Sequence, residues 1–282
     1  MASDNHFKRV TNRLTSYPFR LSAPAMIFGH DIVENADILA TMVDNVEIVL
    51  FHTPTQNNYL SRRDIIKLSG ISQQTGVSYT VHLPTALEVA SPDFRCRTEA
   101  VRLTKALIKQ TLELNPLHFV LHIPYSPPTL VYEPGMYFKR INDSAWQNWL
   151  RRATGSLIDI TTAIGNAAEL LVENINYSVC YLEPLVQKGF CGLCLDVGHL
   201  LLGREPVTPE IARHFEVTRE IHIHGVKGHT DHHSLNVLPQ KRLSKWLQQM
   251  TGMGFSGILN LEVFSPADLK SSLDLISQIG RQ

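Results

Sequence analysis

Histidine and aspartate are concentrated in one stretch of the chain, from Arg219 to Leu235, with the sequence REIHIHGVKGHTDHHSL. It contains five of the chain's 13 histidines, as an alternating pair followed further on by an Asp-His-His triplet. Imidazole and carboxylate groups together form the ligand set typical of zinc and similar transition metals. The chemistry to consider first is therefore that of a divalent metal site.

The alternation of His222 and His224 with isoleucines predicts a strand that carries both imidazoles on one face. Gly225 and Gly228 predict the end of that strand. The loop just beyond its C-terminal end is then expected to hold the triplet Asp231, His232 and His233.

Residues that can bind metal also stand at or just after the ends of other apolar segments. These short runs are of the kind that parallel sheets bury on both faces. A charged group in such a run is costly to bury without a partner, and a shared metal cluster would neutralise the whole set. The candidates at these positions are His82, His122, Glu173, Asp196, His199 and Glu262.

Each candidate taken alone also has a structural interpretation. His122 could be a hydrogen-bonded core histidine, and Asp196 could cap a turn. Glu173 and Glu262 are harder to explain in this way, because carboxylates inside apolar strands are rarely buried without a partner. The recurrence of such residues at successive strand ends favours the metal interpretation. Four other histidines are expected to be structural: His30, His52, His118 and His214.

Strands and helices alternate along the chain. Strands are expected at 21–27, 46–51, 78–82, 118–123, 169–173, 190–196, 220–224 and 258–264, with helices between them. About eight such units predict an α/β fold, a single (β/α)8 TIM barrel over residues 1–282, with a doubly wound open sheet as the main alternative. Residues 1–16 could form an extension outside it. Barrel enzymes carry their chemistry at the C-terminal ends of the strands, where the candidates fall.

Composition limits the partners. The 26 basic and 26 acidic residues balance, so the overall charge does not indicate a polyanion such as duplex DNA. The N-terminus lacks an apolar signal segment, and no run of about 18 apolar residues occurs, which predicts a soluble, cytoplasmic protein. Cys191 and Cys194 form a CxxC inside an apolar run and are expected to be core residues. The oligomeric state is not predicted.

The motifs HLP, HIP, ENI, DVGH, HIHG, DHHSL and LEV, in this order, resemble the AP endonuclease family 2 and sugar phosphate isomerase/epimerase superfamily of TIM barrels. The resemblance covers nearly the whole chain. The isomerase and epimerase branch implies one divalent ion, held by Glu173, Asp196, His222 and Glu262. The endonuclease branch implies a trinuclear zinc site that adds counterparts of His82, His122, His199 and the Asp-His pair. Because this sequence has a candidate for every position, it resembles a phosphoesterase more than an isomerase.

The expected ligand groups follow from this resemblance. One ion is assigned to His82, His122 and Glu173, and Glu173 is expected to bridge to a second ion. The remaining assignments are Asp196, His222 and Glu262 for the second ion, and His199, Asp231 and either His232 or His233 for the third. His222 fits the strand ligand better than His224. Two or three zinc ions are expected, with manganese or another transition metal as the alternative. Such a site can activate water and stabilise an in-line displacement at phosphorus, with Glu173, Asp196 and Glu262 as its catalytic carboxylates.

A narrower resemblance concerns the substrate. Residues 20–54, together with VSYTVHLP and the glycine of HIHGV, are similar to the cobamide-remodelling phosphodiesterases, which implies a corrinoid substrate. The alternatives are a single-metal sugar or sugar phosphate isomerase or epimerase, an AP-endonuclease-like DNA repair nuclease, and a metal-stabilised binding protein. Candidate substrate-binding residues on the expected catalytic face are Tyr125, Tyr132, Tyr137 and Lys227.

Overall fold

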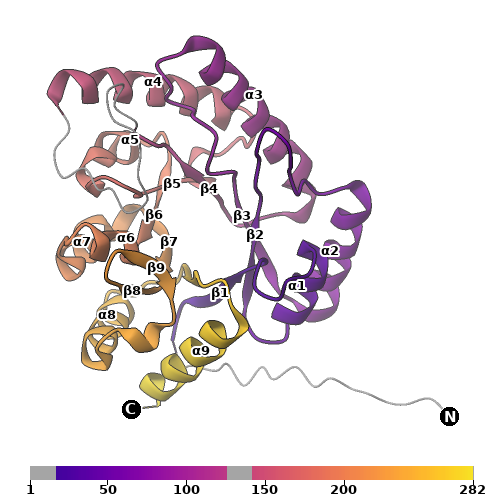
Figure 1. Cartoon of the computed structure of the whole chain (residues 1–282), viewed down its shortest axis with the longest axis vertical. Helices are drawn as coiled ribbons and strands as arrows, with labels where there is room; N and C mark the ends of the chain where they lie inside the picture. Colours follow the sequence, from indigo (N-terminus) through magenta and orange to yellow (C-terminus); the bar gives the residue numbers. More distant parts are fainter. Residues whose placement is uncertain (1–16, 126–141, 282) are drawn as a thin grey trace.

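The computed structural model describes residues 17–125 and 142–281. Eight parallel strands close into a barrel in the order β1-β10-β7-β6-β5-β4-β3-β2, and helices surround it (Figure 1). The prediction of a single (β/α)8 TIM barrel is therefore confirmed. Residues 1–16, Tyr132 and Tyr137 lie outside the described residues.

The barrel strands are short, and each one overlaps a predicted strand. Several predicted strands were too long at the C-terminal end, because buried apolar residues such as Val263 continue past the last hydrogen-bonded pair. The observed strands are β1 (Arg20–Pro24), β2 (Asn45–Val49), β3 (Ser78–His82), β4 (Phe119–His122), β5 (Leu170–Glu173), β6 (Gly192–Asp196), β7 (Thr218–Ile223) and β10 (Ile258–Leu261).

Local sequence signals set the helix bounds. The helix after β2, for example, begins with a capping box: Ser61 Oγ accepts from the Asp64 N–H, and the Asp64 carboxylate accepts from the Ser61 N–H. The described helices are α1 (Ile32–Leu39), α2 (Arg62–Thr75), α3 (Phe94–Thr111), α4 (Asp143–Thr161), α5 (Glu183–Gln187), α6 (Val197–Leu202), α7 (Val207–His214), α8 (Gln240–Gly252) and α9 (Pro266–Gly280). None of them is long and apolar enough to cross a membrane.

Two elements beside the barrel mouth were not predicted. Helix α6 begins directly after β6, and its N-cap is Asp196, whose carboxylate accepts from the His199 N–H at 2.6 Å. The Asp-His-His triplet does not lie on a plain loop. It belongs to β9 (Thr230–His233), which pairs antiparallel with β8 (Gly225–Lys227). Both elements bring histidines over the C-terminal ends of the strands.

The barrel interior contains a polar layer within the apolar core. The Asn45 side chain donates to Ser22 and Thr80, and the Asn260 side chain donates to Glu47 at 2.7 Å. These buried side chains hydrogen-bond to partners on neighbouring or next-but-one strands, as most buried polar groups do. They connect β1, β2, β3 and β10 inside the barrel and, through Glu47, extend to the candidate site.

Candidate metal centre

Glu173, at the end of β5, lies at the middle of the candidate site. Its Oε2 is 3.3 Å from His82 Nε2 and 3.1 Å from His122 Nε2, and its Oε1 is 3.4 Å from His199 Nδ1. The strands β3, β4 and β5 are neighbours, so the ends of their ladders bring these side chains together. His82, His122 and Glu173 form one group whose ligand atoms could bind an ion.

A second group continues from Glu173 around the barrel to β6, β7 and β10. His222 Nδ1 is 3.2 Å from Glu262 Oε2 and 3.5 Å from Glu173 Oε2. Asp196 completes a group of four buried residues with close ligand atoms. Glu173 belongs to both groups, which is the position that a bridging carboxylate requires.

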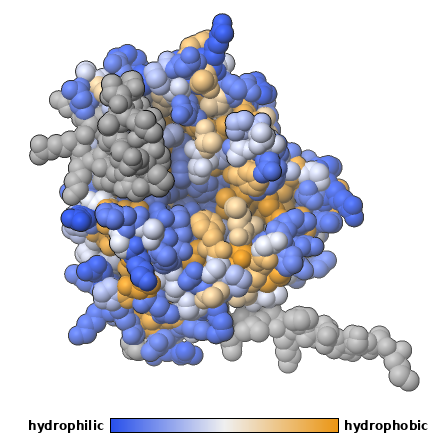
Figure 2. Space-filling model, in the orientation of Figure 1, coloured by the Kyte–Doolittle hydropathy of each residue, from blue (hydrophilic) through white to orange (hydrophobic). Residues whose placement is uncertain are grey.

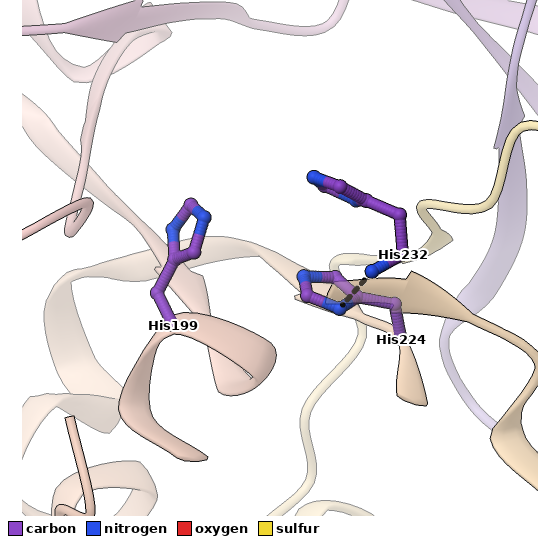
Figure 3. A group of neighbouring side chains, drawn as sticks. All are labelled: His199, His224 and His232. Carbon is purple, nitrogen blue, oxygen red and sulfur yellow. Dashed lines mark hydrogen bonds between the residues drawn. The ribbon is translucent and has the colours of Figure 1, made fainter. Parts of the chain in front are cut away.

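The third group consists of His199, His224 and His232, from the start of α6, the end of β7 and the β9 strand. Their rings lie close to one another in Figure 3, with centroids 4.3 Å apart for His224 and His232. His232 has a φ of 56°, a left-handed conformation that is uncommon for residues other than glycine. Such strain often occurs at functional sites.

Hydrogen bonds orient the imidazoles of this third group. His199 Nδ1 donates to the Asn174 carbonyl at 2.9 Å, and His232 Nδ1 donates to the Glu262 carbonyl at 3.0 Å, which leaves each Nε2 available as a ligand atom. His224 differs, because its Nδ1 accepts from the His232 backbone N–H at 3.0 Å (Figure 3). Its Nε2 then carries the proton and faces Asp196 Oδ2 at 3.3 Å.

Asn174 fixes the end of β5 against the end of β6, and Gly198 makes room for the His224 ring. The Asn174 side chain donates to the Asp196 carbonyl at 2.9 Å and accepts from the Asp196 N–H at 2.8 Å. A Cβ at Gly198 would lie only 1.9 Å from the ring of His224. Only glycine therefore allows the His224 ring to pack against the first turn of α6.

The charges of the site stabilise one another. Burial alone would raise the pKa of Glu173, but the His122 and His222 imidazoles outweigh it and hold this pKa well below its usual value. Burial alone would lower the pKa of His82, but the hydrogen bond to Glu173 and the Glu47 carboxylate raise it to about 9. Opposite charges gathered in this way keep the carboxylates ionised, which is the state that binds metal, and a metal bound at His82 would displace its proton.

Several buried polar atoms of the site make no hydrogen bond within the described part of the chain: Glu173 Oε1, Glu262 Oε2 and both ring nitrogens of His222. Buried polar groups without such partners are rare and call for an explanation. A divalent cation on the Glu173, Asp196, His222 and Glu262 group would satisfy the carboxylate oxygens and Nδ1 of His222. The donor set of imidazole nitrogens and carboxylate oxygens therefore fits a divalent metal.

Two carboxylates of the site were missed in the sequence. Glu47 Oε1 is 3.3 Å from His222 Nε2, and Glu220 Oε1 is 3.7 Å from the same nitrogen. Both stand inside apolar strands, the same signal that singled out Glu173 and Glu262. Both carboxylates face Nε2 of His222, on the side away from Glu173. Nδ1 of His222 faces Glu173 and Glu262 instead. Cys194 also lies within reach of His222 and Glu173, and Cys191 and Cys194 are buried.

The remaining predicted site residues lie at the edge of the three ligand groups or outside them. His232 Nε2 is 3.8 Å from Asp231 Oδ1, but Asp231 belongs to none of the close groups found among the described residues. His233 Nε2 is paired with the Thr230 hydroxyl instead. Of the proposed substrate contacts, Tyr125 is buried after β4 and Lys227 is exposed on β8.

One side of the mouth is apolar. Figure 2 shows a hydrophobic area near β1, β2 and α1 on the face toward the viewer. Met26 and Phe264, 41% and 42% exposed, follow β1 and β10, which are adjacent in the barrel. The Phe264 ring lies 4.9 Å from that of His232, so exposed apolar surface adjoins the third histidine group.

Comparison with known proteins gives the class that this fold and site define. The xylose isomerase-like TIM barrel family matches residues 38–279, and the chain belongs to this family. No match was found among curated proteins.

Solved structures of similar fold include both epimerases and an endonuclease. A D-tagatose 3-epimerase-like protein has a TM-score of 0.75 and 18% identity, over 93% of this chain and 97% of that chain. The 3-keto-D-glucoside 4-epimerase from E. coli has a TM-score of 0.69 and 11% identity, over 94% and 100%. Endonuclease IV from Thermus thermophilus has a TM-score of 0.66 and 16% identity, over 92% and 98%. At these identities the likeness concerns the fold.

Proposed function

We propose that this chain is a metal-dependent phosphodiesterase. The observation that carries the proposal is the position of Glu173, whose Oε2 faces His82, His122 and His222 while its Oε1 faces His199. A single ion on Glu173, Asp196, His222 and Glu262 would need neither His82 nor His122. Glu173 belongs both to the group with His82 and His122 and to the group of four, so its carboxylate instead suits a bridge between two ions.

The proposed ligands follow the three groups of side chains. His82, His122 and Glu173 would hold one ion, and Glu173, Asp196, His222 and Glu262 a second. His199 and His232 would hold a third, with Asp231 as the neighbouring carboxylate. Zinc is the ion favoured by this mixture of imidazole and carboxylate, with manganese as the alternative. When bound, such ions supply Lewis-acid activation of water and neutralise charge on phosphoryl oxygens.

The chain's own groups would position and shield the reaction. Glu173, Asp196 and Glu262 are buried, and their charges are balanced by His222 and its neighbours rather than by water. The Asn174 side chain fixes the backbone of Asp196, so that this carboxylate keeps its direction. Because catalytic groups act best when held rigidly, these contacts suit the proposed reaction, an in-line displacement at phosphorus by water.

We propose a cobamide as the substrate, and the reaction as cleavage of its nucleotide-loop phosphodiester in the cytoplasm. Two features support this. Residues 20–54 resemble the cobamide-remodelling phosphodiesterases, and part of this run lies near the apolar side of the mouth. Met26 and Phe264 expose apolar surface there, which suits a large ligand better than a small sugar.

The test is hydrolysis by protein purified with its metals. We expect it to release a corrinoid fragment from a cobamide, and Glu173→Gln to reduce this rate roughly 100-fold or more, since changes to groups that merely support a metal ligand already cost about 10–100-fold. The matched control is His233→Gln, which changes a histidine outside the three groups. Cleavage of DNA at abasic sites in place of the cobamide would exclude the proposed substrate but keep the phosphodiesterase chemistry.

A second candidate is a single-metal sugar isomerase or epimerase. The compact group of Glu173, Asp196, His222 and Glu262 favours it, because this group alone can hold one ion. The two candidates differ at His82 and His199. A phosphodiesterase loses most of its turnover in His82→Gln and His199→Gln, whereas a single-metal epimerase keeps it and binds one metal per chain.

A further inference from the structure

A second candidate site lies between α3 and α4, which are neighbours in the outer ring of helices (Figure 1). The two helices enclose a groove of about 720 Å³. It shares no residue with the metal groups at the strand ends. Its volume falls within the range of ligand pockets, about 300–1,000 Å³.

The groove is strongly basic. Equal numbers of acidic and basic residues in the whole chain make this local excess informative. Arg102 pairs with Glu99 at 2.6 Å and Lys105 pairs with Asp159 at 2.5 Å, while the other four cations have no carboxylate partner among the described residues. The cations that line the groove are Arg97, Arg102, Lys105, Lys109, Arg151 and Arg152.

Two of these arginines are held in place by backbone carbonyls. Arg97 Nη1 donates to the Ser91 carbonyl at 2.5 Å, and Arg152 Nε donates to the Ala90 carbonyl at 2.8 Å. A guanidinium fixed at one edge still presents its other N–H groups, in the planar arrangement that matches a phosphate. Burial lowers the pKa of Arg152, and the charges of Arg97 and Arg151 lower it further. A bound anion would relieve this repulsion.

The cations also follow a line. Arg97, Lys105 and Lys109 are separated by multiples of four residues, so they follow an inclined row along α3 over about 18 Å. Val101 and Gly155 also line the groove, and a Cβ at Gly155 would meet no atom within 4 Å. The groove thus offers several positions for phosphate groups together with uncharged lining residues.

We propose that the α3–α4 groove binds a small molecule that carries two or more phosphate groups and has the size of a nucleotide. Four cations without a carboxylate partner among the described residues surround one cavity, and they fit several negative charges on one ligand better than a single anion. A long nucleic acid fits less well, because the balanced charge of the chain provides no extended basic surface.

The test uses the metal-loaded protein and MgATP, with AMP and inorganic tripolyphosphate as comparisons, in equilibrium dialysis at 150 mM salt. The groove variant is Lys109→Ala with Arg151→Ala, because neither side chain has a carboxylate partner among the described residues and both are exposed. We expect it to weaken MgATP binding at least tenfold. The matched control, Lys241→Ala with Arg242→Ala on α8, should bind like the wild type.

The measurements with AMP and tripolyphosphate show which part of MgATP the groove recognises. Equal binding of tripolyphosphate and MgATP, with weak binding of AMP, identifies the phosphate chain as the recognised part, whereas preference for MgATP adds the nucleoside. Both results support the site. Unchanged binding in the groove variant, loss of binding in Glu173→Gln, or no MgATP binding at millimolar concentration would each overturn it. Binding of a short single-stranded oligonucleotide in place of MgATP would also overturn it.

Discussion

The backbone N–H of His232 donates to Nδ1 of His224 over 3.0 Å, and this contact decides the tautomer of His224. Because Nδ1 accepts this hydrogen bond with its lone pair, the neutral imidazole carries its proton on Nε2. That nitrogen faces Asp196 Oδ2. The His232 N–H opposes a proton on Nδ1, so His224 is suited to orient Asp196 rather than to bind an ion.

The first prediction follows from this orientation and concerns metal content. We expect His224→Gln to keep the metal content of the wild type, because glutamine can still donate to Asp196. His232→Gln should lose one ion per chain, since its Nε2 is free to bind. Inductively coupled plasma mass spectrometry of the purified proteins measures both, with His233→Gln as the control. The opposite pattern would make His224 a ligand.

The second prediction concerns Gly198, which lies under the His224 ring. In Gly198→Ala, the new Cβ would lie 1.9 Å from that ring, so the ring must shift and its contact with Asp196 Oδ2 must change. We expect lower turnover and weaker binding of the most loosely held ion, with the barrel still folded. Activity and metal retention during dialysis test this, with circular dichroism as the measure of folding. Gly252→Ala on α8, where a Cβ would meet no atom, is the matched control.

The fold could be predicted because its signals are local. Apolar runs of strand length alternate with amphipathic segments, and in a parallel barrel this order alone places every strand end on one face. His82, His122, Glu173, Asp196 and Glu262 could therefore be brought together without any knowledge of their distances.

The rest of the site depends on conformations that the sequence pattern does not display. The φ of 56° at His232 and the β8–β9 pairing decide which imidazole lies near His199. The sequence pattern alone does not distinguish His232 from its neighbour His233. Glu47 and Glu220 are carboxylates in apolar segments, as Glu173 and Glu262 are, but they stand within their strands, so the pattern of ligands at strand ends does not include them. Their importance comes from the barrel interior, where both lie beside His222.

The third prediction tests the start of α2. Ser61→Ala removes the side-chain acceptor of the capping box with Asp64. We expect the free energy of unfolding to fall by roughly 1 kcal/mol, the usual cost of a lost N-cap. Urea unfolding measures it, and Ser61→Thr, which keeps a hydroxyl acceptor, should retain most of the stability. An equal loss in both variants would contradict the capping role.

The last prediction concerns pH and His118, just before β4. Burial and, to a lesser extent, the charges of Arg219 and Arg20 together lower the pKa of His118 from 6.5 to about 4. Its Nδ1 is buried and makes no hydrogen bond among the described residues. Above pH 6.5 the folded and unfolded chains both hold His118 neutral, so it adds no pH dependence there.

Between pH 6.5 and about 4 the unfolded chain binds a proton at His118 that the folded chain does not, so stability falls as the pH falls through this window. We expect His118→Leu to lose less stability than the wild type over that range, and the two proteins to run parallel above it. Urea unfolding at several pH values measures the difference. His30→Gln, an exposed histidine, should follow the wild type, and parallel curves for His118→Leu and the wild type throughout would refute the role assigned to His118.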